Sequence, residues 1–198
     1  MNKSTIAVLE ALLFITLAFL VGAVLSRVMK KKNYPTVSAV VLPISAVTSV
    51  MLVLRYGLSI TAIQGLFLMF VLLYASYSDI ATHEADEYLW VIVFALSLYS
   101  TTTVGIKSML IGALCVIIPQ LAMAWLPPHR TLGGADIKLS TALAFLLGGW
   151  RGIGAYLIGL VIAVIYMAIY NKLKQRDGTE PFALIPFLSV GALIMFLI

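Results

Sequence analysis

The chain has 198 residues, of which 62% are hydrophobic and only 11% are charged, and its mean hydropathy is +1.08. This composition excludes an ordinary soluble domain and is typical of a helical protein that crosses a membrane several times. The single cysteine excludes an internal disulfide and a multi-cysteine zinc site. The net charge of +5 does not indicate a nucleic-acid partner, because the basic residues cluster at the ends of apolar segments, where they set topology.

Eight apolar segments follow one another along the chain. Short breaks with Pro, Gly, Asn or charged residues separate them, and most approach the roughly 20 residues that a helix needs to cross a bilayer. Strands are not expected, because open sheet edges cannot face lipid. The sequence therefore predicts an all-α polytopic integral membrane protein with about eight transmembrane helices, in a single domain over residues 1–198. The predicted segments are residues 5–28, 36–54, 58–78, 88–105, 107–126, 137–149, 152–170 and 182–198.

The basic residues predict how these segments are oriented. If the break after the first segment is cytosolic, alternation places nine Lys and Arg residues on the cytosolic side and four on the other. This asymmetry fits the positive-inside rule, so both termini are predicted to lie outside. Trp90, Trp125 and Trp150 lie near segment ends, as interface anchors do. The nine cytosolic residues are Arg27, Lys30, Lys31, Lys32, Arg130, Lys138, Lys172, Lys174 and Arg176.

Two acidic residues lie at the predicted cytosolic ends of apolar segments. Asp79 follows the segment 58–78, and Asp136 lies shortly before the apolar run 139–149. A charged group at membrane depth costs roughly 3 kcal/mol or more, so a functional role is the first interpretation. Because alternation places both carboxylates on the same side, the sequence predicts a shared acid–base site. The alternative interpretation is a pair of segment-end acids on solvated loops.

Two carboxylates that share a site have a definite chemistry. They cannot both ionise easily, so one holds a proton while the other stays charged. The ionised group can take a proton from water, and the protonated group can polarise a peptide carbonyl. Such a pair hydrolyses an amide without a metal or a covalent intermediate, so neither metal nor cofactor is predicted. The run Gly133-Gly134-Ala135 before Asp136 predicts a non-helical turn, whose glycines let a substrate backbone come close.

The longer run around the second acid is Gly133-Gly134-Ala135-Asp136-Ile137-Lys138-Leu139. It resembles the Gly-x-Gly-Asp-x-Lys motif of the type IV prepilin peptidases, which are membrane aspartic proteases related in chemistry to presenilin. An aspartate that ends a segment and precedes a short polar loop, here Asp79, also resembles that family. The ending, residues 180–187, is similar to the family's last span, which is rich in Pro and Phe. One departure is Ala135, which replaces the motif's second glycine.

The resemblance implies a function and a set of site residues. It makes Asp79 and Asp136 the catalytic dyad, with Gly133, Gly134, Ala135 and Lys138 as supporting or substrate-binding residues. The implied reaction removes the basic leader of pilin-like precursors, just before their apolar helix, at the cytosolic face of a prokaryotic plasma membrane. The implied partners are these precursors and membrane lipid, with no nucleic acid. Only residues 33–36 stand where longer members carry a cysteine-rich methyltransferase insert, which implies a short, cleavage-only form.

Charged residues near the two acids have two interpretations each. Glu84, Asp86 and Glu87 form an acidic cluster after Asp79 that could attract a basic leader. Alternatively, they belong to a solvated loop. Lys138 could orient or tune the acid site, or its ammonium could reach the interface while its stem lies along apolar surface.

Two other functions are compatible with a buried acid pair. A transporter could use Asp79 and Asp136 as a proton or cation site, but it would be expected to show internal repeats around broken helices. Only one short segment, 137–149, is present, without a counterpart elsewhere in the chain. A presenilin-like protease that cuts other membrane substrates is the second alternative.

Overall fold

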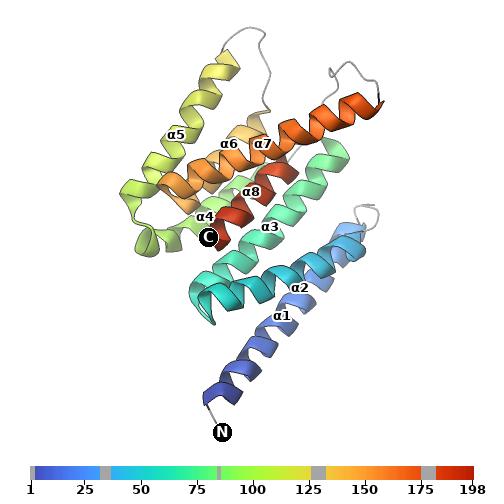
Figure 1. The fold of residues 1–198 in the computed structure, drawn as a ribbon, viewed down its shortest axis with the longest axis vertical. Helices are drawn as coiled ribbons and strands as arrows, with labels where there is room; N and C mark the ends of the chain where they lie inside the picture. Colours follow the sequence, from blue (N-terminus) through green and yellow to red (C-terminus); the bar gives the residue numbers. More distant parts are fainter. Residues whose placement is uncertain (1–2, 32–36, 84–85, 126–132, 175–181) are drawn as a thin grey trace. The chain divides into compact units, whose positions relative to one another are not determined.

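The computed structural model describes residues 3–31, 37–83, 86–125, 133–174 and 182–198 (Figure 1). Within these ranges it contains eight α-helices and no strand, which confirms the predicted fold class, and each helix corresponds to one predicted apolar segment. The helices are α1 Lys3–Lys31, α2 Val37–Tyr56, α3 Ile60–Thr82, α4 Tyr88–Thr103, α5 Ile106–Trp125, α6 Gly134–Leu147, α7 Gly149–Lys174 and α8 Ile185–Leu197.

Five of the described helices, α1, α2, α3, α5 and α7, are long and apolar enough to cross a membrane. Helices α4 and α8 are apolar but shorter, and α6 has 14 residues. Large apolar side chains are exposed along the long helices, which suits a lipid environment; on α5 they include Leu110, Ile111, Leu114 and Ile118. The chain is therefore a multi-pass membrane protein. The outside placement of both termini stays a prediction.

Most helix boundaries differ from the predicted ones by a few residues, and two of these differences concern the acid pair. Helix α3 continues to Thr82, so Asp79 lies inside its last turn instead of after its end. The helix stops where His83 adopts a left-handed backbone with φ of 53°. Helix α6 begins at Gly134, so the predicted non-helical turn is wrong for Gly134 and Ala135, and only Gly133 is extended.

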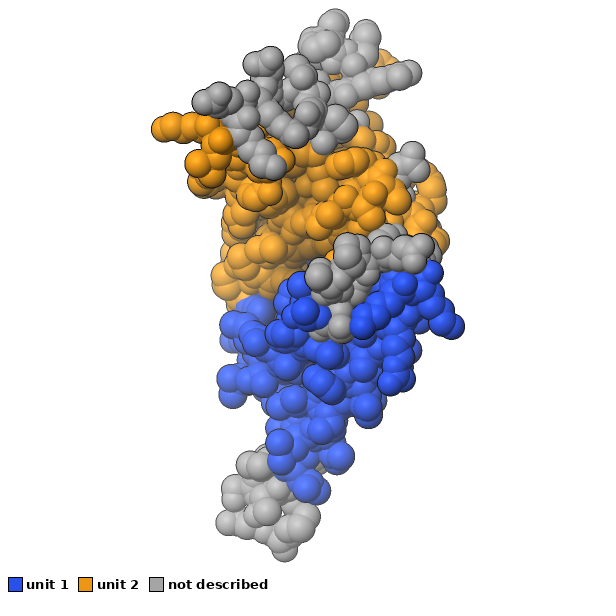
Figure 2. Space-filling view, turned by 90° about the vertical axis from the view of Figure 1, so that its right-hand side faces the viewer, with its two compact units in different colours: residues 1–74, 197 blue, residues 75–196, 198 orange. Residues whose placement is uncertain are grey.

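The chain divides into two compact units, coloured separately in Figure 2. Unit 1 comprises residues 1–74 and 197, and unit 2 comprises residues 75–196 and 198. In unit 1, α1 packs against α2, and the two helices approach closely at Gly22, where a Cβ would lie 2.9 Å from Ser45 Oγ. A single domain over the whole chain stays a prediction.

Helix α6 is the centre of unit 2, because it contacts α4, α5 and α7. Its apolar residues are buried around most of its circumference, as expected of a helix enclosed by others. Two glycines allow the close approach: a Cβ on Gly112 of α5 or Gly152 of α7 would lie 2.7 or 2.6 Å from the Ala144 carbonyl oxygen. Gly191 of α8 likewise packs against Ala155 of α7. This packing fixes the helix that carries Asp136.

Candidate active site

Asp79 lies in the last turn of α3, and its side chain is buried, with 6% of the residue exposed. Its Oδ2 accepts a hydrogen bond of 2.9 Å from the backbone N–H of Ile185, the first residue of α8. The first N–H groups of a helix have no partner within the helix, and the helix dipole favours negative charge there. The start of α8 therefore holds this carboxylate in place.

Asp136 is the third residue of α6 and lies at the N-terminus of its own helix. Its carboxylate interacts with the backbone N–H of Gly133, the residue that caps the helix. An acid in the third position that reaches back to the cap N–H is one half of a capping box. A Cβ on Gly133 would lie 2.9 Å from Asp136 Oδ2, so the glycine leaves room for the carboxylate.

The two carboxylates act on each other electrostatically. Burial and, to a smaller extent, the negative charge of Asp79 together raise the pKa of Asp136 from 3.8 to about 6. The Gly133 N–H lowers it in part. Asp136 precedes the apolar part of α6 and lies outside the five candidate spans. A pair in this state can hold one proton between two carboxyl groups near neutral pH.

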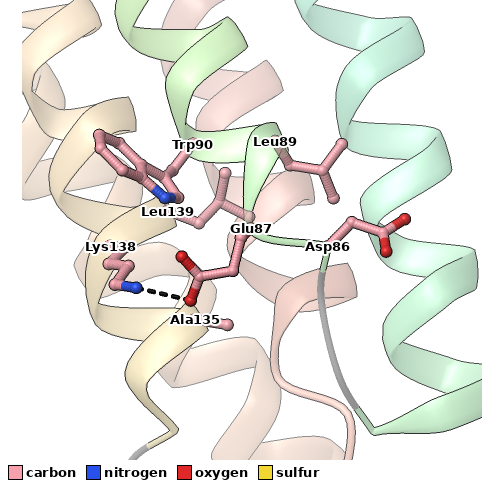
Figure 3. A pocket seen from close by; sticks show the side chains of 7 residues that line it. All are labelled: Asp86, Glu87, Leu89, Trp90, Ala135, Lys138 and Leu139. Atoms are coloured by element: carbon pink, nitrogen blue, oxygen red, sulfur yellow. Dashed lines mark hydrogen bonds and ion pairs between the residues drawn. The ribbon is translucent and has the colours of Figure 1, made fainter.

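Lys138 is joined to the beginning of α4 (Figure 3). Its Nζ donates to Glu87 Oε1 at 2.7 Å, with 44% and 79% of the two side chains exposed. Such an exposed ion pair contributes about 0–1 kcal/mol to stability, so its effect is mainly on geometry. Asp86 accepts a hydrogen bond of 2.8 Å from the Tyr88 hydroxyl. Glu84, the third member of the predicted acidic cluster, lies outside the described residues.

Several polar residues around the acid pair are not obvious from the sequence. Ser140, one turn beyond Asp136, exchanges hydrogen bonds of 2.9 and 3.1 Å with Gln120 of α5, which is 1% exposed. Ser76 of α3 donates to Ser189 of α8 at 3.1 Å. A Gln and a few Ser residues inside apolar runs are the only signal of these contacts, and which of them pair depends on the packing.

Two further titratable side chains lie within electrostatic range of the acids. The His83 imidazole, just after the end of α3, interacts electrostatically with the Asp79 carboxylate. The Tyr156 hydroxyl of α7 interacts electrostatically with the Asp136 carboxylate. Among the described residues, no group of three or more His, Cys, Asp or Glu side chains is arranged to hold a metal ion. Two carboxyl groups that interact in this way are able to carry out acid–base chemistry.

Comparison with known proteins gives one match. The model of the type IV leader peptidase family matches residues 66–170. This range covers more than half of the chain and contains Asp79, Asp136 and Lys138, but not the start of α8. The comparisons with curated proteins and with solved structures find no match.

Proposed function

The chain belongs to the type IV leader peptidase family, and we propose that it is an aspartic endopeptidase in which Asp79 and Asp136 form the catalytic dyad. Membership indicates a protease that acts on prepilin-like substrates in general. The observation that carries the proposal is the electrostatic coupling of two carboxyl groups, each held at a helix N-terminus of unit 2. Family membership also disfavours the transporter alternative, because the family is one of proteases.

The reaction follows from a pair that holds one proton. The ionised carboxylate takes a proton from a water molecule, whose oxygen forms a bond to the scissile carbonyl carbon. The protonated carboxyl gives its proton to the carbonyl oxygen. When the tetrahedral intermediate collapses, the C–N bond breaks and the amine leaves with a proton from one carboxyl group, while a hydroxyl of the intermediate returns its proton to the other, which restores the one-proton pair. Since the two groups titrate together, the acid and base roles belong to the pair.

We infer the substrate and the membrane face from charge. The substrate is a pilin-like precursor whose basic leader precedes an apolar helix, and the site opens to the cytosol of a prokaryote, at its plasma membrane. The nine-to-four distribution of Lys and Arg supports the cytosolic face. Asp86 and Glu87 at the start of α4 support a basic leader, although Lys138 offsets part of their charge. The proposal treats residues 1–198 as one short-form peptidase domain, with Gly133, Gly134, Ala135 and Lys138 in supporting roles.

Cleavage of a defined substrate tests the proposal. The purified protein in detergent is incubated with a prepilin, and the products are identified by mass spectrometry. We expect one cut, just before the apolar helix. Asp79→Asn and Asp136→Asn should each remove cleavage while the protein still inserts in the membrane. If either variant retains more than a few per cent of the wild-type rate, the dyad is wrong. If membrane substrates without a basic leader are cut equally well, the presenilin-like alternative is favoured.

A further inference from the structure

Helices α4 and α6 contact each other. Glu87 pairs with Lys138, and about two turns later the Phe94 ring stacks on the Phe145 ring with centroids 5.1 Å apart. Both pairs are separated by the same number of residues, so the two helices run in the same direction. Trp90 of α4 and Thr141 of α6 have the same separation, from which we infer that they lie at the same level between these two pairs.

Trp90 and Thr141 carry the two buried side-chain polar atoms that have no hydrogen-bond partner in the described part of the chain. These atoms are the indole Nε1 and the hydroxyl Oγ1. Leaving a buried polar group unsatisfied costs about 1–3 kcal/mol, and such groups are rare in native proteins. Trp125 and Trp150, by contrast, are 83% and 65% exposed. Trp90 is thus more buried than these two residues.

A small pocket lies beside Trp90 (Figure 3). Its volume of about 10 Å³ is room for one water-sized group. One wall includes Ala135, which directly precedes Asp136, so the pocket adjoins the candidate active site. The rim is net negative, because it has two carboxylates and one ammonium group. The lining residues are Asp86, Glu87, Leu89, Trp90, Ala135, Lys138 and Leu139.

We propose that this pocket is a binding subsite for the leader of the substrate, in which a backbone carbonyl oxygen accepts a hydrogen bond from Trp90 Nε1. The inference rests on the proposed function. An indole N–H can only donate, so the bound group must be an acceptor. A single carbonyl oxygen suits the volume, and the net negative rim favours a basic peptide over an anionic lipid headgroup. Thr141 does not line the pocket and has no part in the binding.

The test measures leader binding directly, in the cleavage-deficient Asp136→Asn protein, so that catalysis does not enter. A fluorescently labelled, Lys-rich leader peptide is titrated with the protein in detergent, and anisotropy reports the Kd. Adding Trp90→Phe keeps an aromatic ring but removes the N–H. We expect the Kd to rise about 5- to 10-fold, as for the loss of one hydrogen bond. Thr141→Val is the matched control, because it removes the hydroxyl of Thr141, the other buried polar side-chain atom without a hydrogen-bond partner in the described part of the chain. This variant should leave the Kd unchanged.

Each other outcome overturns the subsite. If Trp90→Phe binds as the parent protein does, Trp90 does not contact the leader, although the proposed function stands. If Trp90→Phe and Thr141→Val weaken binding equally, a water molecule shared by the two groups explains both. If the parent protein does not bind the leader, the subsite and the proposed substrate fail together. Should Trp90→Phe not fold, benzothienylalanine at position 90 keeps the ring shape and still removes the N–H.

Discussion

At the scale of single residues, both candidate catalytic acids are held by backbone N–H groups at helix N-termini, and each acid depends on a different helix. Asp136 accepts from the backbone N–H of Gly133, which caps its own helix α6. Asp79 accepts from the backbone N–H of Ile185, which lies 106 residues away in the chain. The first arrangement is local and is visible in the motif. The second depends on the packing of α8 in unit 2, which residue spacing alone does not specify.

Gly133 and Gly134 should differ sharply in their tolerance of alanine. A Cβ at Gly133 would lie 2.9 Å from Asp136 Oδ2, while a Cβ at Gly134 has no heavy atom within 4 Å among the described neighbours. Gly133→Ala should displace the carboxylate and reduce kcat on the order of 100-fold, as a shift of about 1 Å can do. Gly134→Ala should retain most of the activity, because an added Cβ there would not displace the carboxylate and any supporting role of Gly134 would be through its backbone, and it should stabilise α6 by up to about 1 kcal/mol. Equal activity of the two variants in the prepilin assay would show that Gly133 does not place the acid.

The rate should depend on pH through the proton that the acids share. Burial and the charge of Asp79 raise the pKa of Asp136 to about 6, so its proton persists well above the usual range for an aspartate and is lost as pH rises through about 6. We expect kcat/KM for a peptide substrate to fall on the alkaline side with an apparent pKa near 6. The acidic side should fall as the second carboxyl becomes protonated.

A labelling experiment isolates the role of Asp79 in this titration. Carbodiimides modify protonated carboxyl groups, and mass spectrometry identifies the product at Asp136. In Asp79→Asn the midpoint of labelling should move to lower pH, because one negative charge that favours the protonated form of Asp136 is gone. An unchanged midpoint would mean that the two carboxyl groups do not interact.

At the scale of helices, the sequence predicts where each one lies because Pro, Gly and charged residues interrupt long apolar runs. The exact ends are less predictable: α3 runs past Asp79 since no residue between Ser78 and Thr82 breaks a helix. The pattern of apolar and polar residues does not predict which helices pack together or which of their side chains form hydrogen bonds. Gln120 hydrogen-bonds Ser140 and Trp90 is half-buried, and both outcomes depend on how α4 and α5 pack on α6.

The ion pair between Lys138 and Glu87 connects α6 to the start of α4, and charge reversal tests its role. Lys138→Glu or Glu87→Lys alone places like charges together and should lower kcat/KM by up to about 5-fold, in line with a contribution below 1 kcal/mol. The double reversal restores opposite charges and should recover most of the activity. A double variant that is no better than the poorer single one would indicate that Lys138 acts directly on the substrate.

At the scale of the whole molecule, composition and periodicity predict a polytopic all-α protein, and eight helices in the described ranges confirm this. Three of them are shorter than a typical span, and α6 is enclosed by other helices of unit 2. A short helix inside a bundle does not need to match the bilayer thickness, because its ends can lie within protein or a water-filled cavity. Segment length in the sequence therefore does not give the number of complete membrane crossings.

The orientation of the whole chain can be tested by cysteine accessibility in intact cells. The native Cys115 is first replaced by serine, because it is exposed. Single cysteines at Ser38, Glu84 and Gln175 should then be shielded from an impermeant thiol reagent, whereas one at Thr103, the last residue of α4, should be labelled. This pattern follows from nine basic residues on one side against four on the other.

The site at position 84 decides the most, because it lies between Asp79 and the start of α4 in the chain. Labelling there from outside would place the loop after α3 on the outer face, and with it the carboxyl pair. A protease in that orientation could not meet a leader peptide on the cytosolic side before export. The substrate proposal would then fail, even if Asp79 and Asp136 still hydrolysed peptides in detergent.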